Sequence, residues 1–334
     1  MIHKNCDFSD LLDMLIQIVS QDKPDRHSKK EAKSPTMNQR LALQKAFGAA
    51  CLAGSLAAVY PSKAAELGIG EYFLGLTIPM SGYLPPPGIY FSNTFLLYEG
   101  SRPALTANFV ADIAQTAYYL DADVFGGTFG FVATIPFFGD SNSVPVSIYR
   151  QYADISSLAD TDYSAVLGWH AGDNNWCFVL TGFVPTGNYN QDRIVQTGLN
   201  RPALDFKGAY TFLSQQTGSE FSAGLGVTIN ALNTATDYQS GAELHFEWAL
   251  NQHFPFGLAA GVGGYFYQQL TNDYGSGDTL GSFKGRVAAV GPLLSYAFKV
   301  DSQEVDLSAR WFHEFAAENR TQGDMIYAQL SFRL

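Results

Sequence analysis

Three ionisable residues, Glu243, His245 and Glu247, alternate along one short segment. Alternate side chains of a β-strand point to the same face, so a strand here would bring all three together. A histidine between carboxylates could serve as a general base, or the group could bind a metal ion. Alternate strand residues lie about 6.5–7 Å apart, so only two of the three could hold one ion. No Gly-x-Ser-x-Gly element accompanies them. We therefore predict no catalytic residue, metal or cofactor, and a row of hydrogen-bonding groups instead.

Further charged residues follow in three later segments that show the same alternation. Lys284 and Arg286 share one face of their segment, and Asp306, Arg310 and Glu314 share one face of the next. Opposite charges on adjacent strands offset part of each other's cost of leaving water. Two roles are open: a ladder that fills and stiffens an interior, or a polar selectivity lining. The residues expected to face this interior are Glu243, His245, Glu247, Lys284, Arg286, Asp306, Arg310, Glu314 and Arg333.

The elements that would carry these side chains are short segments separated by turn residues. Segments of roughly 10–16 residues with alternating polarity are typical of transmembrane barrels. Short links alternate with longer ones at 140–160 and 188–201, as expected for periplasmic turns and outer loops. The predicted strands are 88–99, 108–120, 126–139, 161–171, 176–187, 202–216, 219–234, 238–252, 257–271, 281–299, 303–317 and 323–334.

The last segment indicates which face is apolar. Ile326, Leu330 and Phe332 alternate with polar residues up to the end of the chain. An apolar outer face on a terminal strand is typical of outer-membrane barrels, although a water-soluble sandwich could show the same alternation. Together with a secretory signal, it favours an all-β fold. The prediction is a single 12-stranded antiparallel transmembrane β-barrel with both ends of the barrel chain in the periplasm.

The N-terminal part divides into segments of different composition. Residues 37–64 have the pattern of a signal peptide: a basic start, an apolar run and a small-residue cleavage site at 62–64. Residues 1–36 are polar, and we interpret them as a mis-assigned start or a disordered extension. Residues 65–87 form a pre-barrel segment, which could plug the barrel, and residues 88–334 form the barrel. The expected location is the bacterial outer membrane.

Charge and size limit the partners. Of 20 Lys and Arg and 31 Asp and Glu residues, nine and six lie in residues 1–64. This leaves 11 and 25, a net charge of −14, which argues against nucleic acid as a partner. A twelve-stranded barrel is wider than one filled by its own side chains, so we expect an occupant of the bore. The candidates are the pre-barrel segment and the link 140–160.

Several motifs in order resemble a known family, the proteins associated with the meta-pathway of phenol degradation. The resemblance covers about residues 66–334, and it departs from the family pattern at Val184 and at the terminal Leu334. It implies an outer-membrane barrel associated with aromatic catabolism. The matching elements are Pro85-Pro86-Pro87-Gly88-Ile89-Tyr90, Gly168-Trp169-His170, Pro185-Thr186-Gly187-Asn188-Tyr189, Thr236-Asp237-Tyr238-Gln239-Ser240-Gly241, Gly263-Gly264-Tyr265-Phe266-Tyr267-Gln268-Gln269, Lys284-Gly285-Arg286 and Glu318-Asn319-Arg320-Thr321-Gln322-Gly323-Asp324.

The function expected from these observations is passive uptake of small hydrophobic or aromatic compounds through a channel. The expected partners are the lipid bilayer, a small-molecule solute, and the outer-membrane assembly machinery through the C-terminal strand. A structural or surface-interaction barrel and a membrane-embedded lipid-modifying enzyme are the alternatives. The enzyme would depend on His245, the histidine that lies between two carboxylates.

Overall fold

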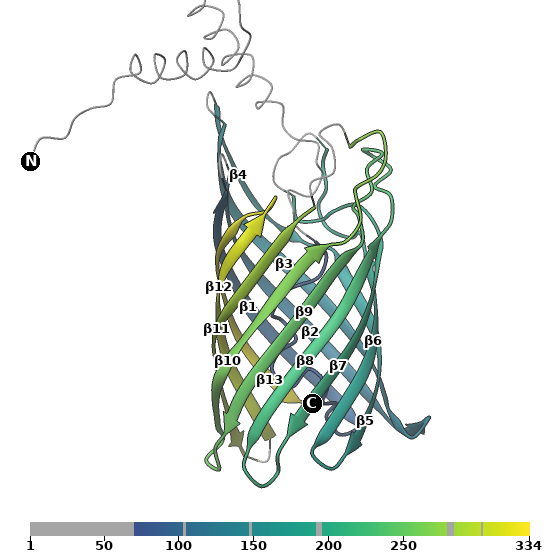
Figure 1. The fold of residues 1–334 in the computed structure, drawn as a ribbon, viewed down its shortest axis with the longest axis vertical. Helices are drawn as coiled ribbons and strands as arrows, with labels where there is room; N and C mark the ends of the chain where they lie inside the picture. Colours follow the sequence, from purple (N-terminus) through teal and green to yellow (C-terminus); the bar gives the residue numbers. More distant parts are fainter. Residues whose placement is uncertain (1–69, 103–104, 147–148, 192–195, 279–283, 302) are drawn as a thin grey trace, which may run out of the picture. The chain divides into compact units, whose positions relative to one another are not determined.

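The computed structural model describes residues 70–102, 105–146, 149–191, 196–278, 284–301 and 303–334 (Figure 1). The predicted segments 1–36 and 37–64 and the first five residues of 65–87 lie outside these ranges. Within them, the regular structure consists of strands and turns. No helix of this part of the chain is long and apolar enough to cross a membrane.

The strands follow one another along the chain as an antiparallel meander with short turns at one end. The element bounds are β1 (Gly88–Arg102), β2 (Leu105–Val124), β3 (Gly127–Val146), β4 (Tyr149–Leu158), β5 (Thr161–Ala171), β6 (Asn174–Val184), β7 (Ala203–Leu213), β8 (Ser219–Asn230), β9 (Glu243–His253), β10 (Leu258–Gln269), β11 (Arg286–Val300), β12 (Gln303–Glu318) and β13 (Gln322–Arg333).

The sheet closes into a barrel because every wall strand has two neighbours. β1 pairs with β13 as well as with β2, and β2 pairs with β3. β3 pairs with β4 along its outer part and with β5 along its inner part, so β4 and β5 occupy one position in the wall. The barrel therefore has twelve antiparallel strands around its circumference, as predicted (Figure 1).

The link 140–160 differs from its prediction as a loop that could fold into the bore. Its backbone extends β3 and then returns as β4, with residue pairs from Phe137↔Leu158 to Val146↔Tyr149. The break in this wall strand lies at Ala159 and Asp160, where the amide of Ala159 still donates to the carbonyl of Pro136 at 2.9 Å. A paired extension of the wall cannot also be a plug, so this candidate was wrong.

A second difference lies before β9. The predicted strand 238–252 begins only at Glu243, and residues 231–242 form an outer loop with a bridge between Asn233 and Tyr238. Asp237 has a positive φ of 50°, which ends the extended backbone locally. This link, which the predicted strands 219–234 and 238–252 left short, is therefore one of the longer outer loops.

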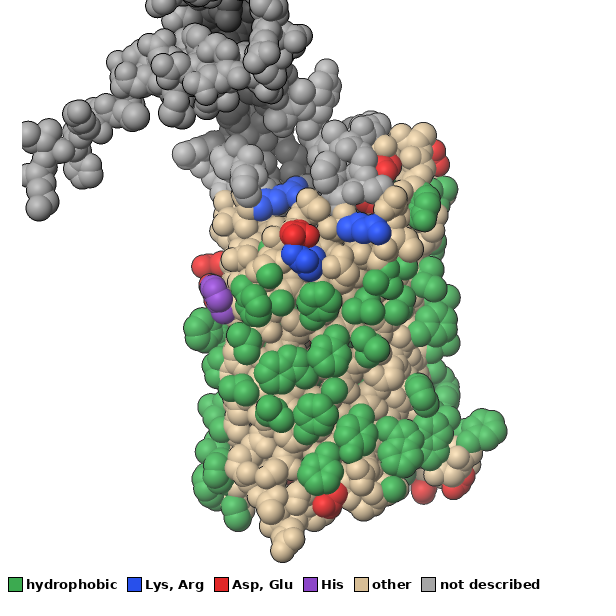
Figure 2. Space-filling view, viewed as in Figure 1, with side chains coloured by type: hydrophobic (Ala, Val, Ile, Leu, Met, Phe, Trp, Pro, Cys, Tyr) green, Lys and Arg blue, Asp and Glu red, His purple; other side chains and the backbone are tan. Residues whose placement is uncertain are grey.

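The two faces of the wall differ as expected for a membrane barrel. In β9, Glu243 and Glu247 are 3% and 0% exposed, whereas Leu250 on the other face is 48% exposed. Exposed apolar side chains form a band over the outer surface, with charged side chains above and below it (Figure 2). A water-soluble sandwich would bury the apolar face and expose the carboxylates. The apolar face therefore meets lipid and the polar face lines the lumen.

Some carboxylates of the wall depart from this rule, and Asp112 is one of them. Asp112 of β2 is exposed on the outer face and pairs with Phe95 and Phe137, which are each 49% exposed. The amide of Asn93 is its hydrogen-bond donor. A carboxylate on the lipid face of a barrel costs free energy, which this contact partly offsets.

Candidate functional site

The pre-barrel segment from Gly70 to Leu84, which we call the lumen segment, lies inside the lumen. Its amide and hydroxyl groups converge on Glu247 of β9. The amide of Gly75 donates to Oε1 at 2.5 Å and the Tyr72 hydroxyl donates to Oε2 at 2.9 Å, with Thr77 as a third donor. A fully buried carboxylate needs such donors, because an unpaired buried charge is costly. Glu247 thus holds the lumen segment against β9.

Arg310 of β12 is positively charged and binds the lumen segment next to Gly75. Its guanidinium donates to the backbone carbonyls of Leu76 at 2.7 Å and Ile78 at 2.6 Å, and to Gln329 at 2.9 Å. It also lies over the ring of Tyr327, with 5.0 Å to the centroid. Because Arg310 is only 3% exposed, the carbonyl groups replace the water that its donors would otherwise bind.

Apolar packing completes the seat of the lumen segment. Leu74, Leu76 and Ile78 are at most 8% exposed and belong to one cluster with wall residues such as Phe312. Gly75 between them has a φ of +81°, and a Cβ there would lie 2.7 Å from the Phe312 ring. Only glycine fits this turn without strain. The lumen segment is therefore packed as tightly as a core element.

Towards the periplasmic end, the lumen segment is bound by the neighbouring wall. The amide of Met80 donates to Glu220 of β8, and the amide of Gly82 donates to the Thr211 hydroxyl of β7, both at 2.9 Å. The thiol of Cys177 donates to the carbonyl of Ser81 at 3.4 Å. These contacts hold the chain across the lumen up to the prolines that precede β1.

Seven of the nine residues predicted to face the interior lie inside the barrel or at its mouth. Glu243, His245, Glu247, Arg310 and Glu314 are buried inside the barrel. Asp306 shares the inward face of β12 and is half-buried. Arg333 lies at the periplasmic mouth, exposed, and donates to the carbonyl of Pro87 at 2.7 Å.

Lys284 and Arg286 do not face the lumen, which corrects their prediction. The inward residues of β11 are Val287, Ala289 and Leu293. Lys284 and Arg286, which precede them at even-numbered positions, therefore point outward. At the extracellular rim Arg286 pairs with Glu318 at 2.5 Å, and Lys284 donates to the carbonyl of Leu270. The small and apolar face of β11 turns inward because it packs against the lumen segment. The expected ladder of alternating charge therefore does not form.

Tyrosines rather than cations satisfy the carboxylate of β12. Glu314 is 0% exposed and accepts from the hydroxyls of Tyr98 at 2.9 Å and Tyr265 at 2.8 Å, and from the amide of Gly323 at 3.0 Å. Hydrogen bonds to a charged group are the strong ones, so these three contacts compensate for much of its desolvation.

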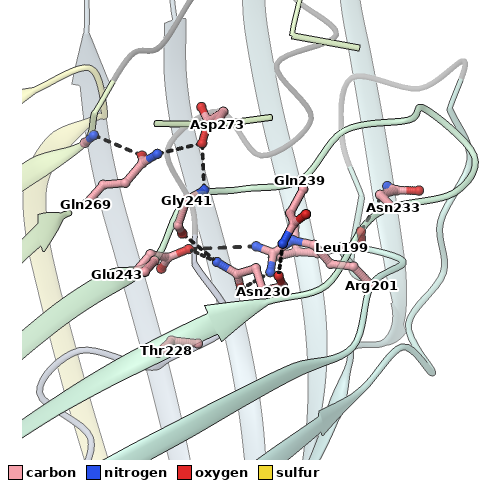
Figure 3. Close-up of polar contacts among 12 residues, drawn as sticks. Leu199, Arg201, Thr228, Asn230, Asn233, Gln239, Gly241, Glu243, Gln269 and Asp273 are labelled. Carbon is pink, nitrogen blue, oxygen red and sulfur yellow. Dashed lines mark hydrogen bonds and ion pairs between the residues drawn. The ribbon is translucent and has the colours of Figure 1, made fainter. Parts of the chain in front are cut away.

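At the extracellular end a buried network joins the outer loops to the wall (Figure 3). Asn230 donates to Glu243 at 2.8 Å, and the guanidinium of Arg201 lies 3.9 Å from the same oxygen. Asp273 accepts from the amide of Gly241 at 2.9 Å and from Gln269 at 2.6 Å. The network anchors the loops after β8 and β10 to the rim. Arg201, Asn230 and Asp273 were not among the residues predicted to face the interior.

A cavity of about 340 Å³ remains between the lumen segment and the opposite wall. Aromatic and aliphatic side chains of both line most of it, including Phe73, Leu76 and Val179. Asp162, Asp205 and Lys207 line it towards the extracellular end, and Tyr90 and Tyr119 towards the periplasmic end. Lys207 is the one Lys or Arg among the described residues of the lining. Asp205 and Lys207 alternate with Leu204 and Phe206, so the strand pattern contained the signal for them.

A solved structure of another protein agrees with this architecture. The fold is similar to that of an outer membrane channel from Pseudomonas putida, with 14% identity, coverage of 77% of this chain and 99% of that chain, and a TM-score of 0.62. For the beta domain of the Bordetella autotransporter BrkA the values are 10%, 74%, 100% and 0.44. No curated protein sequence matches the chain.

The closed barrel with its apolar outer band places the protein in the bacterial outer membrane. A family model described as "Putative MetA-pathway of phenol degradation" matches residues 87–330. The match includes β1 to β12 and most of β13, well over half of the sequence. The chain belongs to this family.

Proposed function

We propose that the protein is a passive channel for small, mainly apolar or aromatic solutes, and that they pass through the cavity beside the lumen segment. The observation that carries the proposal is the division of the lumen. The lumen segment packs against the inner side of β9 to β12. The cavity of about 340 Å³ is left between the segment and the other wall. Its largely aromatic and aliphatic lining suits solutes of the same character.

The buried charges of β9 and β12 have a positioning role in this proposal. Glu247 and Arg310 bind groups of the lumen segment, so neither needs to contact a solute. Withdrawal of the segment would remove the hydrogen-bond partners of both charges, which is costly for buried charges. It would also expose three packed aliphatic side chains. We infer that the segment stays seated while solutes pass.

The features of His245 favour a channel over an enzyme. Its ring is 1% exposed, stacks on Tyr72 with 3.6 Å between centroids, and binds Asp205 through Nε2 at 2.8 Å. A catalytic base must reach a substrate proton within hydrogen-bond distance, which this enclosure prevents. We also propose that β13, which closes the barrel against β1, is the strand that the outer-membrane assembly machinery recognises.

Transport can be tested in vesicles whose outer leaflet is lipopolysaccharide, which slows the entry of apolar solutes through lipid. We expect faster entry of benzyl alcohol than in protein-free vesicles, and no entry of a trisaccharide. Ala117→Trp fills the cavity from β2 and should lower the rate. Ala114→Trp on the outer face of the same strand is the matched control. Equal rates with and without protein would favour a closed structural barrel instead.

A further inference from the structure

The extracellular end of the cavity carries a charged cluster whose two aspartates are not explained by the seating of the lumen segment. Asp162 of β5 and Asp205 and Lys207 of β7 are 7%, 1% and 7% exposed and line the cavity. We call these three residues the head-group cluster. Elsewhere in the cavity the lining is mostly apolar or uncharged, so a solute would meet fixed charge mainly here.

The bonding of Asp205 is incomplete. Its Oδ1 accepts from Thr228 at 2.8 Å and contacts His245 Nε2 at 2.8 Å. Its Oδ2 is buried and has no hydrogen-bond partner among the described residues. Buried carboxylate oxygens normally accept at least one hydrogen bond, so this oxygen requires a donor.

The ammonium group of Lys207 does not supply that donor. It donates to the Thr77 hydroxyl at 3.0 Å and the Tyr72 hydroxyl at 3.3 Å, both on the lumen segment. Within the described chain, no ion pair joins it to either aspartate. Two carboxyl groups and one ammonium group that is already bonded to the lumen segment make the cluster rich in hydrogen-bond acceptors.

We propose that the head-group cluster is the selectivity subsite of the channel: it accepts the hydroxyl or ammonium group of a solute with an aromatic or apolar body, and it excludes carboxylates. The inference rests on the proposed function. A donor reaching Asp205 satisfies an acceptor that no described residue pairs, whereas a carboxylate brings a negative charge to a poorly hydrated site that already holds acidic side chains. Like charges at such a site repel strongly because the effective dielectric constant is low.

The test compares three probes with one ring and different head groups: benzyl alcohol, benzylammonium and benzoate. Uptake is measured in the lipopolysaccharide vesicles with the full mature chain. We expect benzyl alcohol and benzylammonium to enter about tenfold faster than benzoate, a ratio that corresponds to about 1.4 kcal/mol. The Asp162→Asn/Asp205→Asn variant should reduce this ratio to about twofold, mainly by admitting benzoate.

Two further variants separate charge from packing. Asp162→Asn alone leaves the contacts of Asp205 with His245 and Thr228 and should shift the ratio part of the way. Glu99→Gln removes an exposed carboxylate from the outer face of β1 and should leave the ratio unchanged. Equal entry of the three probes in the wild type, or an unchanged ratio in both aspartate variants, would overturn the subsite. Entry of none of the probes above the protein-free rate would overturn the channel itself.

Discussion

Loss of Glu247 should loosen the lumen segment without unfolding the barrel. In Glu247→Ala, the Gly75 amide and the Tyr72 and Thr77 hydroxyls lose their shared acceptor. Hydrogen bonds to a charged group contribute about 1.5–3 kcal/mol each. Because water can enter and replace part of them, we expect a net loss of about 3 kcal/mol in the free energy that seats the segment. That value corresponds to about a 150-fold larger open population.

Hydrogen exchange of peptides from residues 70–84 measures this population directly, because exchange of a buried amide follows its opening equilibrium. We expect the Gly75 amide to exchange about 150-fold faster in Glu247→Ala, and to a smaller extent in Glu247→Gln, which keeps one acceptor oxygen. Glu318→Ala, a change at the outer rim, is the control and should have no effect. Unchanged exchange in Glu247→Ala would refute the role of this carboxylate as the anchor.

Three other perturbations have expected outcomes. Gly75→Ala forces a Cβ against Phe312 at a φ of +81° and should destabilise the seated segment by about 1–3 kcal/mol, read from the same exchange experiment; wild-type exchange would contradict the tight turn. Asp112→Leu removes a carboxylate from the lipid face and should stabilise the barrel by about 1 kcal/mol in reversible unfolding, whereas a loss of stability would show that the contact with Asn93 outweighs desolvation. The Ser276 hydroxyl and amide donate to Asp237 and hold the pKa of that exposed loop carboxyl below its ordinary value. This loop contact should therefore stabilise the folded protein at a pH above the pKa that Asp237 has in the unfolded chain. The stabilisation should be lost as the pH falls through the lower pKa that Asp237 has in the folded chain. In Ser276→Ala the pKa of Asp237 should rise in an NMR titration, and an unchanged pKa would contradict this cause.

The strand pattern predicted the wall well because alternation reports directly on two different environments. Leu244 and Glu243 could be assigned to opposite faces, and the number of wall strands followed from the turns. Segment 286–300 is apolar on both faces, so its alternation could not show which residues point inward. Lys284 and Arg286 were therefore placed on the wrong side.

The seat of the lumen segment could not be derived from the sequence. Glu247 and Arg310 were predicted to face the interior as members of a charge ladder, but each binds backbone groups of residues 74–78. Backbone amides and carbonyls are common to all residues and leave no compositional signal. The β4 extension was missed for a related reason, since pairing with β3 is made through the backbone.

Solutes are proposed to pass while the lumen segment stays seated, and a covalent lock on the segment can examine this. Ser81→Cys puts a second thiol on the residue whose carbonyl oxygen lies 3.4 Å from the Sγ of Cys177. A disulfide between them would fix the segment to β6 and add no heavy atoms to those of the two thiols. We expect the same rate of benzyl alcohol uptake in the oxidised and reduced forms of this variant. Loss of uptake on oxidation, with recovery on reduction, would show that the segment must move for solutes to pass and would refute passage beside a seated segment.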